Sequence, residues 1–170
     1  MRKLNFLKTV LDLFWLFSLI TGVGLLVFIP IYLFGSDVDI PIKFKGQEII
    51  TKTIFTKFIV VAYIISGLFF IYSIYLLRKV VILFTKKEIF NDEVVKLFNI
   101  IGKLIIISSI ISTLSLFIYN VVERNQVGLS LDFGGYDSFL ISISLGLFFM
   151  VISEIFKIAK NMKEESDLMI

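Results

Sequence analysis

The sequence contains no cysteine and no histidine among its 170 residues. The absence of cysteine excludes disulfides, thiolate nucleophiles and iron–sulfur ligation, and the absence of histidine removes the commonest metal ligand and the usual general base. Proline is represented by two residues, and charged residues make up only 18% of the chain. These absences argue against most enzyme chemistry, so we expect a protein that is not an enzyme and that has no cofactor or metal site.

Apolar residues make up 58% of the chain, and the mean hydropathy is +0.96. Four apolar runs, at about 12–35, 58–77, 98–122 and 138–158, are long enough to cross a bilayer, which takes about 20 helical residues. The first run follows basic residues, as in a signal peptide, but it is too long for one and lacks an A-x-A cleavage site, so we expect it to be retained. We therefore predict an all-α integral membrane protein, multi-pass, with a single domain (1–170) of four transmembrane helices.

Lysine and arginine are distributed unequally between the two sides of this predicted bundle. Eleven lie in the N-terminal segment, the loop after the second run and the C-terminal segment, whereas five lie in the first and third loops. Because basic residues are enriched in the cytoplasmic segments of membrane proteins, we predict that both termini are cytoplasmic.

The two predicted extracytoplasmic loops, residues 36–57 and 123–137, have strand-like patterns. Apolar and polar residues alternate over 38–44 and 127–133, and residues 48–54 are rich in β-branched side chains. A lone pair of strands is marginal in water, whereas three strands are more stable. We therefore predict that the two loops form a small β-strand cap, the alternative being that both loops lack regular structure.

The predicted cytoplasmic loop, residues 78–96, mixes basic and apolar residues. Asn91 is a good N-cap because its short side chain can accept a backbone N–H, and Asp92 and Glu93 complement the positive end of the helix that follows. The basic residues either determine topology, which is the commoner role, or form a docking surface for acidic lipid or a cytoplasmic partner.

Small residues recur four apart in the predicted spans, a pattern that lets helices approach closely. The pairs are Ser18 with Gly22, Ala62 with Ser66, Ser108 with Ser112, Ser109 with Thr113, and Ser142 with Gly146. The hydroxyls of the third span, which also include Ser115, either support packing or line a polar path. Serines in spans more often bond their own backbone or a neighbouring helix, which favours packing.

Three ionisable residues, Asp12, Lys103 and Glu154, lie within or at the edge of the predicted spans and form a candidate intramembrane charge cluster. The predicted topology places all three on the cytoplasmic side at similar depth, and an unpaired charge in hydrocarbon costs at least about 2.5 kcal/mol. Lys103 either bridges to an acid, with Glu154 favoured because it lies deeper than Asp12, or points to lipid and extends its ammonium to the headgroups. The second arrangement is favoured if the serine face of the span packs inward, because helical periodicity places Lys103 opposite Ser108.

The last stretch and the middle loop carry a family resemblance. The chain ends in a Glu-bearing helix followed by Glu165, Asp167, Leu168 and Ile170, and the middle loop contains Phe90, Leu97 and Gly102. In these features the chain resembles the bacterial membrane proteins grouped as domain-of-unknown-function family 2975, although Met169 replaces the threonine that is usual there. The resemblance implies four spans over the whole length, the cytoplasmic (inner) membrane of a bacterium as the location, and no established activity. It also implies a neighbouring gene for a small helix-turn-helix regulator of the Cro type.

From these observations we predict a sensory or regulatory accessory of the lipid bilayer that tethers a small cytoplasmic DNA-binding regulator and does not itself bind nucleic acid. The contact surfaces would be the cytoplasmic loop and the tail, residues 160–170. Assembly into a homo-oligomer stays open. One alternative is a small transporter or channel subunit that uses the third-span hydroxyls, and another is a peptide-toxin immunity protein that binds the peptide through its outer loops.

Overall fold

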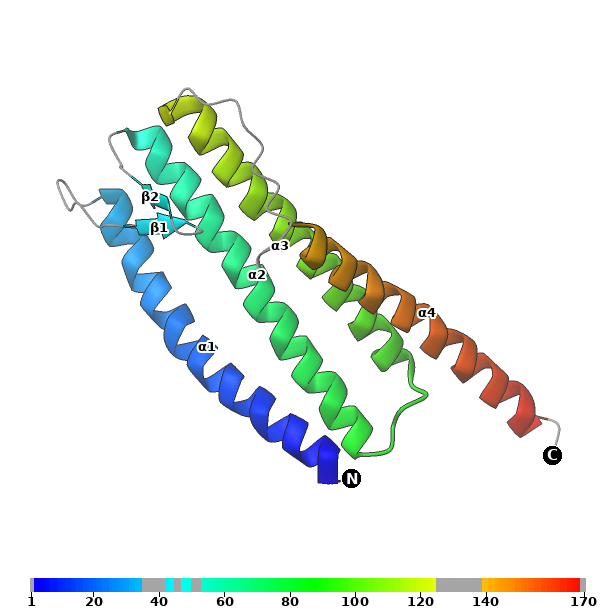
Figure 1. Cartoon of the computed structure of the whole chain (residues 1–170). Coiled ribbons are helices and arrows are strands. Elements are labelled where there is room, and N and C mark those ends of the chain that lie inside the picture. Colours follow the sequence, from blue (N-terminus) through cyan, green and yellow to red (C-terminus); the bar gives the residue numbers. More distant parts are fainter. Residues whose placement is uncertain (1, 35–41, 45–46, 50–52, 125–138, 169–170) are drawn as a thin grey trace.

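The computed structural model describes residues 2–34, 42–44, 47–49, 53–124 and 139–168. The elements in chain order are α1 (Arg2–Phe34), β1 (Ile42–Phe44), β2 (Gln47–Ile49), α2 (Ile54–Thr85), α3 (Asp92–Arg124) and α4 (Phe139–Leu168). All four helices are long and apolar enough to cross a membrane, as the prediction of four helical spans requires. Successive helices run in opposite directions, so the two chain ends lie at the same end as the α2–α3 connection (Figure 1). We call this the terminal end, and the opposite one the hairpin end.

The helices are longer than a bilayer requires. They contain 33, 32, 33 and 30 residues, which gives lengths of about 45–50 Å against an apolar bilayer core of about 30 Å. Most of the extra length lies at the terminal end, where α1 begins at Arg2, α2 continues to Thr85 and α4 continues to Leu168. We call the helical turns that lie beyond the predicted spans at the terminal end the helical extension. The predicted cytoplasmic loop of 78–96 is therefore mostly helical.

Local capping closes the short α2–α3 connection. After α2, Lys87 adopts a left-handed backbone conformation with a φ of 65°, and the Glu88 N–H donates to the Leu83 carbonyl at 3.1 Å. Such a turn satisfies carbonyls that the end of a helix leaves without partners. Before α3, the Asn91 side chain accepts a bond from the Glu93 N–H at 3.1 Å, which confirms the predicted N-cap.

Each helix packs mainly on its neighbour in sequence, so the helices form an open row in the order α1, α2, α3, α4 (Figure 1). One apolar core lies toward the terminal end between α2, α3 and α4, where Val80, Val94 and Ile101 are almost fully buried. A smaller core joins Tyr32, Val60 and Tyr119 at the hairpin end. The helices at the two edges of the row, α1 and α4, expose large apolar side chains along their length, as expected for surfaces that face lipid.

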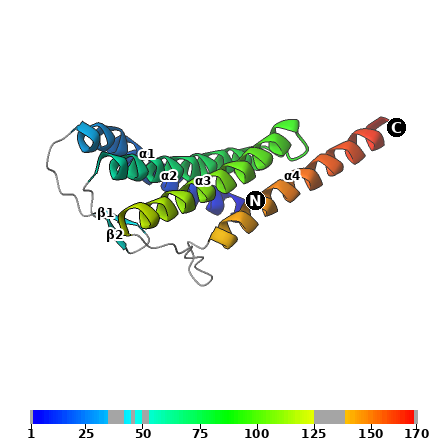
Figure 2. The same cartoon turned by 90° about the horizontal axis from the view of Figure 1, so that it is seen from above.

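The helices α3 and α4 approach each other closely at Gly102 and Gly146. A Cβ atom built on Gly102 would lie 2.5 Å from the Gly146 carbonyl oxygen, and one built on Gly146 would lie 2.8 Å from the Gly102 carbonyl oxygen. Small residues at both positions let the two backbones touch, as expected where dispersion drives helix packing in a membrane. Beyond this crossing α4 runs past the start of α3 toward the C-terminus (Figure 2).

The predicted β-strand cap is corrected to a short hairpin. β1 and β2 pair antiparallel with Ile42 opposite Ile49, but each strand has only three residues. The second predicted strand, 48–54, is cut short because α2 begins at Ile54 with Thr53 as its N-cap. The third predicted strand, 127–133, lies outside the described residues, and among the residues that are described the strands form this two-stranded hairpin.

Candidate functional site

A chain of ion pairs connects all four helices at the terminal end. Among the described residues, Asp12 of α1 pairs with Arg78 of α2, and the adjacent Lys79 pairs with Glu93 of α3. Asp92, next to Glu93, pairs with Lys160 of α4. Adjacent residues on a helix point about 100° apart, so each two-residue segment of α2 and α3 can hold both neighbouring helices. The ion pairs thus link the four helices to one another at this end.

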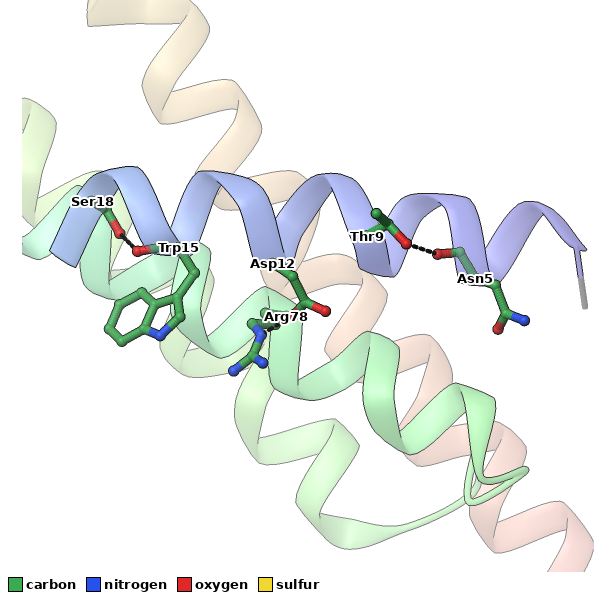
Figure 3. A network of polar contacts seen from close by, with 6 residues as sticks. All are labelled: Asn5, Thr9, Asp12, Trp15, Ser18 and Arg78. Atoms are coloured by element: carbon green, nitrogen blue, oxygen red, sulfur yellow. Dashed lines mark hydrogen bonds and ion pairs between the residues drawn. The ribbon is translucent and has the colours of Figure 1, made fainter. Parts of the chain in front are cut away.

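The Asp12–Arg78 pair lies where the apolar runs of α1 and α2 end. The Arg78 Nε donates to Asp12 Oδ1, and both side chains are partly buried. Figure 3 shows the Asp12 carboxylate directed across the helix interface toward the Arg78 guanidinium, with Trp15 one turn further along α1. The Trp15 ring packs against Tyr75, with centroids 4.6 Å apart. This pair of contacts joins α1, which has few other buried residues, to the rest of the bundle.

The α3–α4 tie is formed by Asp92, Lys160 and Glu164, which lie outside the predicted apolar spans. The Lys160 ammonium lies 2.7 Å from Asp92 Oδ2 and 3.3 Å from Glu164 Oε1. The hydrogen bond from Lys160 lowers the pKa of the Asp92 carboxyl below its ordinary value, and the same bond raises the pKa of the Lys160 ammonium. Each charge therefore stabilises the charged form of the other.

A polar groove adjoins this tie, between the α2–α3 connection and the end of α4. It has a volume of about 480 Å³, and its walls include Lys87, Glu88, Asn91 and Lys163. The Lys163 ammonium lies 5.6 Å from the centroid of the Phe90 ring. Each of residues 161–168 of α4 is exposed, and residues 165–168 continue beyond the groove.

The predicted cluster of Asp12, Lys103 and Glu154 is not brought together as one group. Asp12 is engaged by Arg78, whereas Lys103 and Glu154 both line a second groove between α3 and α4. No ion pair joins Lys103 to Glu154 in the part of the chain that the structure describes. Lys103 is exposed on the same face as Ile107, and Ser108 is buried, as the helical periodicity predicts.

The hydroxyl residues of α3 border a cavity of about 310 Å³ between α2, α3 and α4. The Ser108 hydroxyl donates to the Ser66 carbonyl at 2.7 Å, and the Ser66 hydroxyl donates to the Tyr63 carbonyl at 2.6 Å. These bonds to the backbone fit the predicted packing role. The described residues that line the cavity carry no charge.

A polar tie at the hairpin end joins α2 to α3. The hydroxyls of Thr53 and Thr56 both donate to Oε1 of Glu123, the former at 2.8 Å, and Thr56 is fully buried. On the same face of α3, one turn before Glu123, Asn120 is buried and its Oδ1 has no hydrogen-bond partner among the described residues. This tie fixes the N-cap of α2 against the last turn of α3.

The family comparison now has a structural basis. A model of the family described as protein of unknown function DUF2975 matches residues 12–170. The chain belongs to this family. No curated protein and no solved structure matches the chain. The DUF2975 match begins at Asp12, so it covers most of α1, all of α2, α3 and α4, and the residues of the described ion-pair chain.

Sequence reasoning missed most of this ion-pair chain in the DUF2975 protein. Arg78 was assigned to topology, yet it directly follows the apolar run of α2, as Asp12 directly precedes that of α1. Because α1 and α2 are antiparallel, these two positions lie at the same membrane edge. Opposite charges at matching edges of consecutive spans are the signal that would have identified the pair.

Proposed function

We propose that this integral membrane protein is a non-enzymatic regulatory accessory whose helical extension holds a small helix-turn-helix regulator at the cytoplasmic face of the membrane. The observation that carries the proposal is the end of α4. Residues 161–168 continue as helix past the start of α3 and are exposed; Lys163 and Glu164 line the polar groove, and residues 165–168 extend beyond it. Short helices without tertiary packing are marginal in water, so this segment is suited to gain stability from a partner.

The charge of this segment indicates the kind of partner. It contains Glu164, Glu165 and Asp167 against a single basic residue, Lys163. A DNA-binding protein is basic on the surface that meets DNA, and an acidic helix complements such a surface. The positive-inside rule supports a cytoplasmic position for this end of the molecule. Docking here would compete with DNA for the regulator, which gives the membrane protein a regulatory role.

The ion-pair chain supports a role in sensing as well as in tethering. Because it connects α1 through α4 at one level, a displacement of one helix in the bilayer changes the position of the whole extension. Partner binding at α4 and the arrangement of the spans would then depend on each other, as linkage requires.

The proposal is tested by recruitment of the Cro-type regulator that the family resemblance leads us to expect beside this gene. We would co-express it as a fluorescent fusion with the full chain and measure the membrane-bound fraction. Glu165→Gln with Asp167→Asn should reduce that fraction at least about fivefold, because two of the docking acids are lost. Asn5→Lys with Thr9→Lys is the matched control, since it makes the same charge change on an exposed part of α1. A regulator that stays in the cytosol with the wild-type chain would overturn the proposal.

A small transporter or channel subunit is the second candidate, and the hydroxyl-lined cavity between α2, α3 and α4 is the observation that favours it. The bonds of Ser66 and Ser108 to backbone carbonyls leave those hydroxyls less available to a permeating solute. Flux of sodium, potassium or chloride into liposomes that contain the purified chain would favour this candidate.

A further inference from the structure

The groove between α3 and α4 is built mainly from basic and polar side chains. It has a volume of about 470 Å³ and lies near the membrane edge at the terminal end. Its polar lining residues include Lys96, Asn99 and Lys103 of α3 together with Ser153, Glu154 and Lys157 of α4. The Ser153 hydroxyl donates to the Val95 carbonyl at 2.7 Å, which holds α4 against α3 along the groove.

The three lysines of the groove are not neutralised by ion pairs. Among the described residues, none of Lys96, Lys103 and Lys157 has an acidic partner within ion-pair distance. Asp92 also lines the groove, but its carboxylate is engaged by Lys160 at 2.7 Å. One acid, Glu154, therefore faces three ammonium groups, and the groove carries an excess of positive charge.

The position of the lysines matches the headgroup region of one leaflet. Lys96 and Lys103 are seven residues apart on α3, which places them on one face about 10 Å apart along the axis. Lys103 lies among exposed apolar residues that include Ile107 and Ile110. An ammonium there avoids hydrocarbon by extending toward the headgroups, which is the direction of Lys96.

An apolar groove of about 360 Å³ adjoins the basic one, and Asn99 and Glu154 line both. Its other walls are Leu147, Met150, Val151, Ile155 and Ile158. A basic groove beside an apolar groove suits an anionic phospholipid, whose phosphate would lie in the basic groove and whose acyl chain would lie in the apolar one.

We propose that the α3–α4 groove is a binding site for an anionic phospholipid with a hydroxylated headgroup, of the phosphatidylglycerol type. Lys96, Lys103 and Lys157 bind the phosphate, and Asn99 and Glu154 accept hydrogen bonds from the headgroup hydroxyls. A choline headgroup is disfavoured because it offers no hydroxyl donors and its own positive charge opposes the three lysines. The site is distinct from the docking surface at the end of α4, and neither proposal depends on the other.

The test is native mass spectrometry of the purified full chain in detergent with added phospholipid. Dioleoyl phosphatidylglycerol should stay bound, and dioleoyl phosphatidylcholine at the same concentration should be lost. The variant Lys96→Gln, Lys103→Gln, Lys157→Gln should lower the apparent affinity for phosphatidylglycerol at least about tenfold, because each lysine near a membrane surface contributes to anionic lipid binding. Lys157→Arg should keep the affinity near the wild-type value, since the charge is retained.

The matched control removes three lysines at the same end but outside the groove, at Lys3, Lys86 and Lys87, all of which are exposed. It should bind phosphatidylglycerol like the wild type. An equal loss in this control would mean that net charge alone attracts the lipid, and it would overturn the proposal. Equal binding of phosphatidylcholine would also overturn the proposal.

Displacement of the bound lipid by millimolar glycerol 3-phosphate would assign the groove to small phosphates instead of a lipid. Circular dichroism confirms that each variant is folded.

Discussion

Replacement of Gly102 by alanine tests the packing of α4 directly. The new Cβ would lie 2.5 Å from the Gly146 carbonyl oxygen and 2.7 Å from Cγ of Met150, whereas ordinary contact begins at 3.4 Å. Met150 can change its rotamer, but the carbonyl belongs to the backbone of α4. The two helices must therefore separate by about 1 Å at the crossing, which loosens dispersion contacts along the interface.

Two opposing contributions set the size of the effect. Overpacking in a close interface costs about 1–3 kcal/mol, and glycine to alanine inside a helix contributes about 0.5–1 kcal/mol of stability. We therefore expect Gly102→Ala to lower the free energy of unfolding by about 1 kcal/mol, and by at most about 2.5 kcal/mol. Gly146→Ala should act similarly, because its Cβ would meet Ile106 and the Gly102 carbonyl oxygen. The double variant should cost less than the sum, since the first change already separates the helices.

Gly24 and Gly67 are the matched controls, because a Cβ at either position has no atom within 4 Å. Their alanine variants should leave stability unchanged or raise it by up to about 1 kcal/mol. The assay is unfolding by sodium dodecyl sulfate in mixed micelles, followed by circular dichroism. If Gly102→Ala proves as stable as Gly67→Ala, the close approach of α3 and α4 is refuted.

Three further predictions concern the polar ties. Arg78→Asp should lower stability by about 1 kcal/mol, and Asp12→Arg added to it should restore most of that loss, as measured in the same unfolding assay. Glu123→Gln should cost about 1–2 kcal/mol because the threonine hydroxyls lose a charged acceptor; an unchanged unfolding midpoint would contradict the tie. At pH values above the ordinary carboxyl pKa, near 3.8, the Asp92–Lys160 ion pair should be fully formed. It should weaken as the pH falls through the lowered pKa of Asp92, because the carboxylate is then protonated. Spin-label distances between α3 and α4 would report this, and Asp92→Asn should abolish the dependence.

The four spans were predictable because each is a long apolar run with few charged residues, and length and hydropathy are enough to identify such a helix. The helical extension was not. Residues 78–85 carry Arg78 and Lys79 at the point where the apolar run stops, so hydropathy alone ends the helix there. The buried side chains of Val80 and Leu83 continue it, and this burial depends on the packing of α2 against α3, which no local pattern encodes.

The candidate site was predictable only in part. Asn91 was identified as an N-cap from local chemistry, and capping depends on residues close in sequence. Helical periodicity predicts that Lys103 lies on the opposite face from Ser108, and the structure has Lys103 exposed and Ser108 buried. The partners of Asp12 and Asp92 lie 66 and 68 residues away, so they depend on the register between helices, and the sequence of one chain does not fix that register. Gly146 was noted as a small residue, but its contact with Gly102 also depends on this register.

The cytoplasmic position of the helical extension underlies the proposed function, and site-directed labelling tests it without background because the chain has no native cysteine. Single cysteines would be placed at Ser166, on the exposed end of α4, and at Gly46, which lies between α1 and α2 in the sequence. An impermeant maleimide applied to intact cells should label the cysteine at position 46 and should label the one at position 166 only after the membrane is opened. Labelling of position 166 alone in intact cells would contradict the account.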